Sequence, residues 1–308
     1  MKKACLWALL LSFLLSGCAA RQESRTVFCM DTVMTLRVSG PEAAQALERV
    51  EAELYRLDAL LGPDAPESAE AQALLERAAE ISRMTGGAFD CTLGAVSALW
   101  GFGTEQARIP SEDELAAALA VSGWEKTAAP GRRIDFGAIG KGYAAAQARR
   151  ILTDAGVSSA LLSLGGNVLA LGRKPDGSRW QVGLQDPDDP EAYFGVLSAE
   201  DESVVTSGGY QRYFEQDGVR YWHILDPKTG RPARSGLLSV TVVCRDDALA
   251  DALSTALFVL GAEDGAALWR AHPDLFDAVF LTDDREILVT QGLETRFSAE
   301  TACEVIRP

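Results

Sequence analysis

Helical and strand patterns are separated along this chain. Apolar residues recur every three or four positions over residues 41–61, which is typical of an amphipathic helix. Further helices are predicted at about 68–84, 140–155 and 246–261. Strands are predicted at 26–40, 160–164, 180–184, 203–207 and 237–244, with a hairpin at 277–290. Because the strands gather in the C-terminal half and do not alternate with the helices, the expected fold is α+β.

Local signals support several of these boundaries. Pro41 occupies the first-turn position of the predicted 41–61 helix. Ser111 and Glu114 have the spacing of a capping box before another apolar helical run. Asp217-Gly218 predicts the turn of a β-hairpin. Gly261 is expected to end the helix that begins near residue 246.

The N-terminus has the pattern of a lipoprotein signal peptide. Lys2 and Lys3 precede a short apolar run, and "LSGC" at 15–18 is a lipobox. We therefore expect a signal peptide at 1–17, a lipidated Cys18 followed by a polar tether at 18–26, and one domain at 27–308. The protein would then be extracytoplasmic and lipid-anchored to the bacterial membrane. The alternative is a plain signal peptide with an incidental cysteine.

Charge and cysteine spacing exclude several classes of protein. The formal net charge is −15, which is unsuited to binding nucleic acid or to an electrostatic hold on anionic lipid. The four cysteines after Cys18 include no C-x-x-C pair, so a zinc ribbon or thioredoxin motif is excluded. Outside the cell a disulfide among Cys29, Cys91, Cys244 and Cys303 is permitted but not required.

A glycine-rich turn with a lysine indicates a phosphate site of an uncommon kind. The stretch "IDFGAIGKGYAAA" at 134–146 precedes a predicted helix. A P-loop would need glycine at position 135 and serine or threonine at 142, where the chain has Asp135 and Gly142. The dinucleotide pattern G-x-G-x-x-G is also absent. Lys141 is therefore a candidate phosphate ligand outside both motifs.

Asp251 and Thr255 form a candidate magnesium site. They are four residues apart on a predicted helix, so both oxygens lie on one face. A carboxylate and a hydroxyl are hard oxygen ligands that suit magnesium. A solvated helix face would also explain the pair. The rest of this helix is apolar, however, and a buried aspartate needs a partner such as a cation.

Three further stretches allow both a structural and a functional interpretation. Asp90, with Trp100 and Phe102 close behind, fits either an aromatic-walled pocket or a helix–loop–helix core. Asn167 follows two glycines and fits an ordinary turn equally well. His223 is predicted in mid-strand, where packing is the commoner role, and His272 near a helix end is expected to be structural.

Together and in order, these stretches resemble the FAD:protein FMN transferase family, or ApbE family. The resemblance runs from about Phe28 to about Gly261. The motifs that carry it are "MDT" at 30–32, "TGGAFDCTLG" at 85–94, "IDFGAIGKGYAA" at 134–145, "LLSLGGNVLALG" at 161–172, "WQVGLQDP" at 180–187, "VTSGGYQRYF" at 205–214, "HILDPKTGRP" at 223–232 and "ADALSTALFVLG" at 250–261.

The resemblance implies a fold and a reaction. The expected fold is a single compact domain of the ApbE-like, T-fold-related type. The expected activity is the magnesium-dependent transfer of FMN from FAD to a threonine or serine hydroxyl of an acceptor protein, with release of AMP. The implied acceptor is a flavoprotein subunit of an extracytoplasmic or membrane electron-transfer complex.

The resemblance also implies roles for particular residues. It assigns magnesium to the carbonyl of Ala138 and to Asp251 and Thr255, with Asp251 also counted as catalytic. We propose His223 as the base, because it is the one plausible histidine and lies in a motif facing the proposed site. The implied FAD contacts are Met30, Ala88, Phe89, Asp90, Asp135, Lys141, Ser207, Gly208, Tyr210 and Leu225.

One departure from the family pattern leaves alternatives open. The segment after Leu61 is shorter than in many relatives, which carry a serine-rich turn and an asparagine over the flavin there. A hydrolase that splits FAD into FMN and AMP with water is therefore an alternative. A non-catalytic flavin-binding lipoprotein is a second one. A flavin carrier should contain its own acceptor motif, and the nearest stretch, "STAL" at 254–257, lacks the final threonine.

Overall fold

The computed structural model describes residues 22–62, 68–126 and 130–308. The predicted signal peptide, Cys18 and the first residues of the predicted tether lie outside these ranges, as does most of the shortened segment after Leu61. Within the described ranges, no helix combines the length and apolar character needed to cross a membrane.

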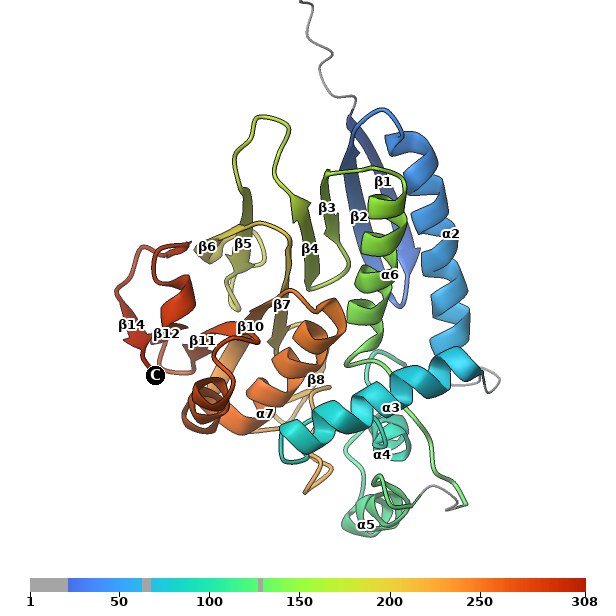
Figure 1. Cartoon of the computed structure of the whole chain (residues 1–308). Helices are drawn as coiled ribbons and strands as arrows, with labels where there is room; N and C mark the ends of the chain where they lie inside the picture. Colours follow the sequence, from blue (N-terminus) through green and yellow to red (C-terminus); the bar gives the residue numbers. More distant parts are fainter. Residues whose placement is uncertain (1–21, 63–67, 127–129) are drawn as a thin grey trace, which may run out of the picture.

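The centre of the fold is a nine-stranded sheet (Figure 1). Its neighbouring strands are antiparallel except for β12 and β14, which are parallel. In spatial order the strands are β1 (Gln22–Cys29), β2 (Thr32–Ser39), β3 (Ser159–Ser163), β4 (Asn167–Gly172), β7 (Glu202–Gly208), β10 (Leu237–Cys244), β11 (Asp277–Thr282), β12 (Ile287–Thr290) and β14 (Cys303–Ile306).

Three helices cover one face of this sheet (Figure 1). Helices α2 (Ala43–Leu61) and α6 (Gly140–Asp154) pack on β1–β4, and α7 (Asp247–Ala271) packs on β7 and β10. Their apolar stripes, such as Leu47, Leu54 and Leu57 of α2, are fully buried there. Burial of these stripes is the main force that holds the helices on the sheet.

A small second sheet covers part of the other face. It contains β5 (Trp180–Gln185), β6 (Tyr193–Ala199) and β13 (Phe297–Ser298). Its apolar side chains pack against β4, β7, β10, β11 and β12 in a separate core. The outer face of β1 and β2 is not part of that core.

The remaining elements form one end of the molecule (Figure 1). They are α3 (Ala69–Met84), α4 (Gly94–Trp100), α5 (Glu112–Val121) and the hairpin β8 (Tyr213–Gln216) and β9 (Val219–Trp222). Tilted aromatic rings join the end of α4 to the hairpin: Trp100 lies 6.3 Å from Phe214 and 5.8 Å from Tyr221 between ring centroids.

Most predicted elements are found, with four differences. The strand predicted at 26–40 is instead the hairpin β1/β2, in which Met30 and Asp31 form the turn with φ of 49° and 55°. Residues 22–26, expected in the tether, belong to β1. Helix α2 begins at Ala43 rather than Pro41. Helix α7 kinks at Gly261, with φ of 83°, and continues to Ala271.

Other local predictions are confirmed. The Ser111 side chain caps α5 and the Glu114 carboxylate returns to the Ser111 backbone, as a capping box requires. Asp217 and Gly218 form the β8/β9 turn with positive φ.

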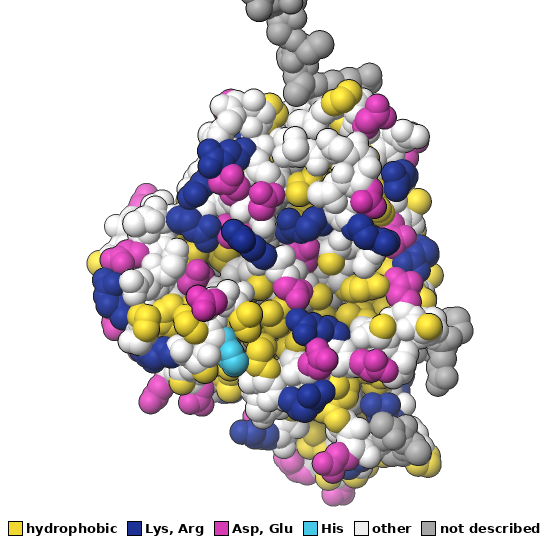
Figure 2. All heavy atoms as spheres, in the orientation of Figure 1, with side chains coloured by type: hydrophobic (Ala, Val, Ile, Leu, Met, Phe, Trp, Pro, Cys, Tyr) yellow, Lys and Arg dark blue, Asp and Glu magenta, His cyan; other side chains and the backbone are white. Residues whose placement is uncertain are grey.

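Acidic and basic side chains are interleaved over the face seen in Figure 2, so no large patch of one sign is visible among the described residues there.

Candidate functional site

One large cavity lies where the ends of several elements meet. Its volume is about 1360 Å³, more than the roughly 300–1,000 Å³ typical of a small-molecule site. It is bounded by the β1/β2 turn, the start of α6, the loop after β3, the end of β7, the segment around Phe89 and the residues after β9. A ligand of dinucleotide size could be accommodated there.

This cavity brings together the residues that the sequence singled out. Among the residues assigned to FAD, magnesium or catalysis, Gly208 is the exception. A Cβ there would lie 2.4 Å from the Tyr210 ring, so Gly208 makes room for Tyr210 and does not itself line the cavity. The predicted residues that line it are Met30, Ala88, Phe89, Asp90, Asp135, Ala138, Lys141, Ser207, Tyr210, His223, Leu225, Asp251 and Thr255.

Asp251 is a buried carboxylate at the cavity wall. It is only 4% exposed, and its Oδ2 accepts a hydrogen bond from the backbone N–H of Gly142 at 2.8 Å. Thr255 lies one helical turn further along α7 and also lines the cavity. Ala138 lies in the loop just before α6. Asp251, Thr255 and Ala138 thus line the same space.

This donor set fits magnesium. Magnesium is bound through oxygen and keeps several waters, so one or two carboxylates are enough when substrate phosphates complete the shell. Within the described ranges, no group of three histidine, cysteine or acidic residues could hold a metal. The carboxylate of Asp251, the hydroxyl of Thr255 and the carbonyl of Ala138 are hard oxygen donors of the kind that suits magnesium.

Helices α6 and α7 cross in close contact beside Asp251. A Cβ on Gly142 would lie 2.4 Å from the carbonyl oxygen of Asp247 and 2.6 Å from Cβ of Asp251. Only glycine therefore allows this approach. The close crossing is what brings the α6 backbone within hydrogen-bonding distance of the Asp251 carboxylate.

A buried ion pair fixes the same crossing. Arg149 of α6 makes two hydrogen bonds, of 2.7 and 2.9 Å, to the carboxylate of Asp247 of α7. Asp247 is 3% exposed and also accepts a hydrogen bond from the Ser203 hydroxyl of β7. The paired geometry and the third hydrogen bond satisfy a carboxylate that burial would otherwise destabilise.

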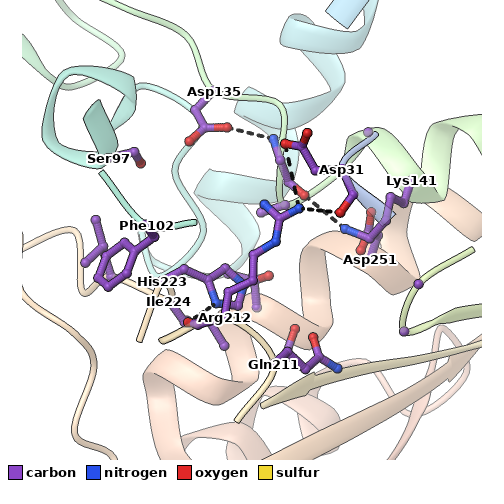
Figure 3. Close-up of a pocket in the computed structure, with 18 of the residues that line it drawn as sticks. Asp31, Ser97, Phe102, Asp135, Lys141, Gln211, Arg212, His223, Ile224 and Asp251 are labelled. Atoms are coloured by element: carbon purple, nitrogen blue, oxygen red, sulfur yellow. Dashed lines mark hydrogen bonds and ion pairs between the residues drawn. The ribbon is translucent and has the colours of Figure 1, made fainter. Parts of the chain in front are cut away.

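Lys141 and Asp135 flank the loop that opens α6. The Asp135 carboxylate accepts the backbone N–H of Gly137 at 2.8 Å, and Lys141 Nζ reaches the Gly137 carbonyl at 3.3 Å. Figure 3 shows Lys141, Asp135, His223 and Asp251 around one space. An ammonium beside a buried carboxylate is suited to binding a phosphate that also contacts a cation at that carboxylate.

His223 lies directly after β9 rather than in mid-strand as predicted. Its Nδ1 is 3.2 Å from the carbonyl oxygen of Arg212. Because a carbonyl can only accept, Nδ1 carries the proton and Nε2 is left free to accept another. Burial, and secondarily the Lys141 ammonium, lowers the pKa of His223 to about 4. The ring is therefore neutral near pH 7.

Negative charge gathers around Cys91. Burial, together with the nearby carboxylates of Asp135, Asp90 and Asp251, raises the pKa of this thiol well above its usual value. The four described cysteines are all unpaired. These carboxylates disfavour ionisation of the thiol, so Cys91 is not a ready nucleophile.

Several cavity residues were not predicted. Arg212 links two hairpins across the cavity: its Nη2 donates to the carbonyl of Asp31 at 3.1 Å and lies 3.7 Å from the Asp31 carboxylate (Figure 3). Gln211 and Ser97 also line the cavity. Gln211 and Arg212 lie within the stretch 205–214, which was the only sequence signal for them.

The structure decides between the structural and functional interpretations of the stretch from Asp90 to Phe102 and of Asn167. Trp100 is fully buried and its indole N–H donates to the carbonyl of Gly230 at 2.7 Å, so it belongs to the core behind the site, whereas Asp90 and Phe102 line the cavity. Gly165 and Gly166 form a turn with positive φ. Asn167 after them is fully buried and does not line the cavity.

Comparisons with known proteins agree with this arrangement. A family model described as the ApbE family matches residues 30–280. An FAD:protein FMN transferase of Treponema pallidum is 36% identical, over 90% of this chain and 89% of the relative. One of Klebsiella pneumoniae is 38% identical, over 73% of each chain.

Solved structures of similar proteins have the same fold. The crystal structure of the ApbE protein from Thermotoga maritima superposes with a TM-score of 0.81 at 29% identity, covering 88% of this chain and 98% of that one. The apo form of the flavinyl transferase ApbE from Pseudomonas stutzeri superposes with a TM-score of 0.76 at 32% identity, covering 92% and 98%.

Proposed function

Because this chain belongs to the ApbE family and is an enzyme that transfers FMN from FAD to a protein, we propose that it performs this transfer with magnesium, on a threonine or serine hydroxyl, and with release of AMP. One observation carries the proposal beyond the family. A buried carboxylate, a lysine and a neutral histidine from three separate segments surround a single large cavity.

FAD is the substrate that this cavity would hold. We place its flavin half against Met30 and the stretch Ala88–Asp90, with its pyrophosphate at the loop that opens α6. Tyr210 and Leu225 would contact the remainder. Ser207, whose hydroxyl is 2.8 Å from that of Ser254, would present a fixed oxygen to the nucleotide.

Lys141 and the α6 loop would hold the pyrophosphate for reaction. Phosphoryl transfer depends mainly on positioning and on offsetting the charge of the departing group. The Lys141 ammonium can supply one cation to the phosphates. Magnesium held by Asp251, Thr255 and the Ala138 carbonyl would supply a second, stabilising negative charge on the phosphate oxygens.

His223 would remove the proton from the acceptor. In the proposed step the acceptor oxygen forms a bond to the phosphorus of the FMN half, and the bond from that phosphorus to the oxygen of AMP breaks. The hydroxyl proton passes to Nε2 of His223, which the hydrogen bond at Nδ1 leaves free. The ring is already unprotonated near pH 7, as a base must be.

We also propose where the reaction takes place. A lipid at Cys18 would anchor the chain outside the cytoplasmic membrane, and the acceptor would be a flavoprotein subunit of an extracytoplasmic or membrane electron-transfer complex. The support for the anchor is the lipobox at 15–18. Incorporation of labelled lipid in cells, and its loss in Cys18→Ala, tests this directly.

Intact mass spectrometry tests the reaction. The chain from Ala19 onward is incubated with FAD, magnesium and an acceptor domain that carries one reactive threonine. The expected result is a gain of one FMN by the acceptor, abolished by EDTA and by Asp251→Asn. Asp264→Asn, an exposed acid further along α7, is the matched control and should be fully active.

Three outcomes would contradict the proposal in whole or in part. Free FMN and AMP in equal amounts, with an unmodified acceptor, would make the protein an FAD hydrolase that uses water as nucleophile. FAD binding without any turnover would make it a flavin-binding protein. Activity that survives exhaustive EDTA treatment would remove magnesium from the reaction while leaving the transfer intact.

A further inference from the structure

The outer face of the β1/β2 hairpin carries an exposed apolar pair beside the cavity. Phe28 and Val33 lie directly opposite one another in the two strands and are 66% and 61% exposed. The turn between them, Met30–Asp31, lines the cavity. Large apolar side chains that remain exposed next to a site commonly mark an interaction surface.

This face has the other features of a contact surface. Side chains alternate between the two faces of a strand, so Val27, Cys29 and Met34 point to the helical core, and Phe28 and Val33 point away from it. The second sheet covers β4 and its neighbours but not β1 and β2. Strand β1 is also an edge of the nine-stranded sheet. An edge strand presents unpaired backbone groups that a second chain can contact.

The charge of the face narrows the choice of partner. On the outward side of the two strands the described side chains are Gln22, Ser24, Thr26, Phe28, Val33, Thr35 and Arg37. Arg37 is therefore the single charge on this face, in a chain of net charge −15. An apolar group accompanied by a neutral or acidic surface would complement it better than a basic one would.

The mouth of the cavity continues this surface. Asp31 of the hairpin turn is held by Arg212, next to Tyr213, which lines the cavity and is 44% exposed. The Arg220 guanidinium lies over the Tyr213 ring, 4.2 Å from its centroid. Ordered aromatic rings are favoured contact groups at protein interfaces. The turn between the two residues of the apolar pair is thus tied to the rim by the hydrogen bond from Arg212.

We infer that the acceptor protein docks on the outer face of β1/β2, with an apolar side chain near its reactive hydroxyl seated against Phe28 and Val33. The inference rests on the proposed function, because the hydroxyl of a folded protein must enter this cavity and its neighbouring residues must then cover the rim. Docking there would place the acceptor chain over the Met30–Asp31 turn and direct its hydroxyl toward His223.

Binding and turnover are measured separately to test this. The variant is Phe28→Thr/Val33→Thr, which places a β-branched residue at both positions and so preserves their strand preference. Leu275→Thr, at another exposed apolar residue that does not line the cavity, is the control. Circular dichroism and the Kd for FAD, both expected to be unchanged, establish that each variant is folded and its cavity intact.

The first measurement is the Kd for an acceptor whose reactive threonine is replaced by valine, so that no transfer can occur. Loss of a central apolar contact should weaken binding by about tenfold or more in the double variant, and not in Leu275→Thr. The second is the transfer rate, in which KM for the acceptor should rise while kcat at saturating acceptor stays the same.

An unchanged acceptor Kd in the double variant would overturn the docking site. Equal weakening by Leu275→Thr would overturn it as well, since the effect would then be general. Failure of the proposed function is distinguished by the wild-type protein, which would leave the acceptor mass unchanged whatever the Kd measurements show.

Discussion

The backbone N–H of Gly142 donates a hydrogen bond to Oδ2 of Asp251 across the crossing of α6 and α7, at 2.8 Å. This single contact joins the glycine-rich loop of the candidate phosphate site to the carboxylate of the candidate metal site. Its existence depends on a backbone approach that only glycine permits.

Gly142→Ala is therefore expected to damage stability and metal binding together. The added methyl would meet Asp247 and Asp251 at less than 3 Å, and overpacking of this kind costs about 1–3 kcal/mol. Thermal unfolding and the magnesium dependence of transfer measure both effects. Gly140→Ala is the control: its Cβ would meet Leu61 at an ordinary 3.6 Å, so stability should be unchanged or slightly higher. Similar behaviour of the two variants would contradict this account of the crossing.

Asp251→Asn is expected to keep the fold and lose the reaction. The amide oxygen can still accept the hydrogen bond from Gly142, but the negative charge for a cation is gone. Loss of several kcal/mol of metal-derived stabilisation corresponds to about 10²-fold or more in rate. Magnesium titrations of transfer should show a greatly raised requirement at an unchanged melting temperature. Wild-type magnesium dependence in this variant would exclude Asp251 as a ligand.

The acid limb of the pH–rate profile should report His223. Because burial lowers the pKa of this ring to about 4, kcat/KM should fall only as the pH drops toward 4, and not near 6.5. His223→Ala should be slower by about 10²–10⁴-fold and should lack this limb. His272→Ala, at the other histidine of the chain, should retain both rate and profile. Circular dichroism over the same pH range separates titration from unfolding. An acid limb that persists in His223→Ala would assign the titration to another group.

The Arg149–Asp247 pair should contribute to stability mainly by satisfying a buried charge. Arg149→Met leaves Asp247 with the Ser203 hydroxyl alone and should cost about 3–5 kcal/mol, measured by urea unfolding. The double variant Arg149→Met/Asp247→Leu removes both charges and should recover most of that loss. Equal destabilisation in the single and double variants would show that shape, and not charge, determines the effect.

The sequence predicted the candidate site better than it predicted the local backbone. Asp251, Lys141 and His223 could be found because their residue types are chemically distinctive and their surrounding stretches resemble one family. The β1/β2 turn could not, because Met30-Asp31 has no Asn or Gly although both residues adopt positive φ. The apolar run on either side was therefore interpreted as one strand.

Other features depend on contacts that are remote along the chain. Arg212 reaches Asp31, 181 positions away, and no local pattern reveals such a contact. Trp100 follows Asp90 closely enough to suggest a shared pocket wall, yet its indole turns into the core toward Gly230. In α7, Gly261 has the backbone expected of a helix end, but packing of the following turns on the sheet restores the helix beyond it.

Strand β1 also determines how the molecule is presented. Its first residue, Gln22, and the turn at the cavity are at opposite ends of one eight-residue strand, a span of roughly 25 Å (Figure 1). This strand pairs with β2 along its whole length, so it acts as an extended spacer. The opening of the cavity therefore lies about one strand length away from the point at which the described chain begins.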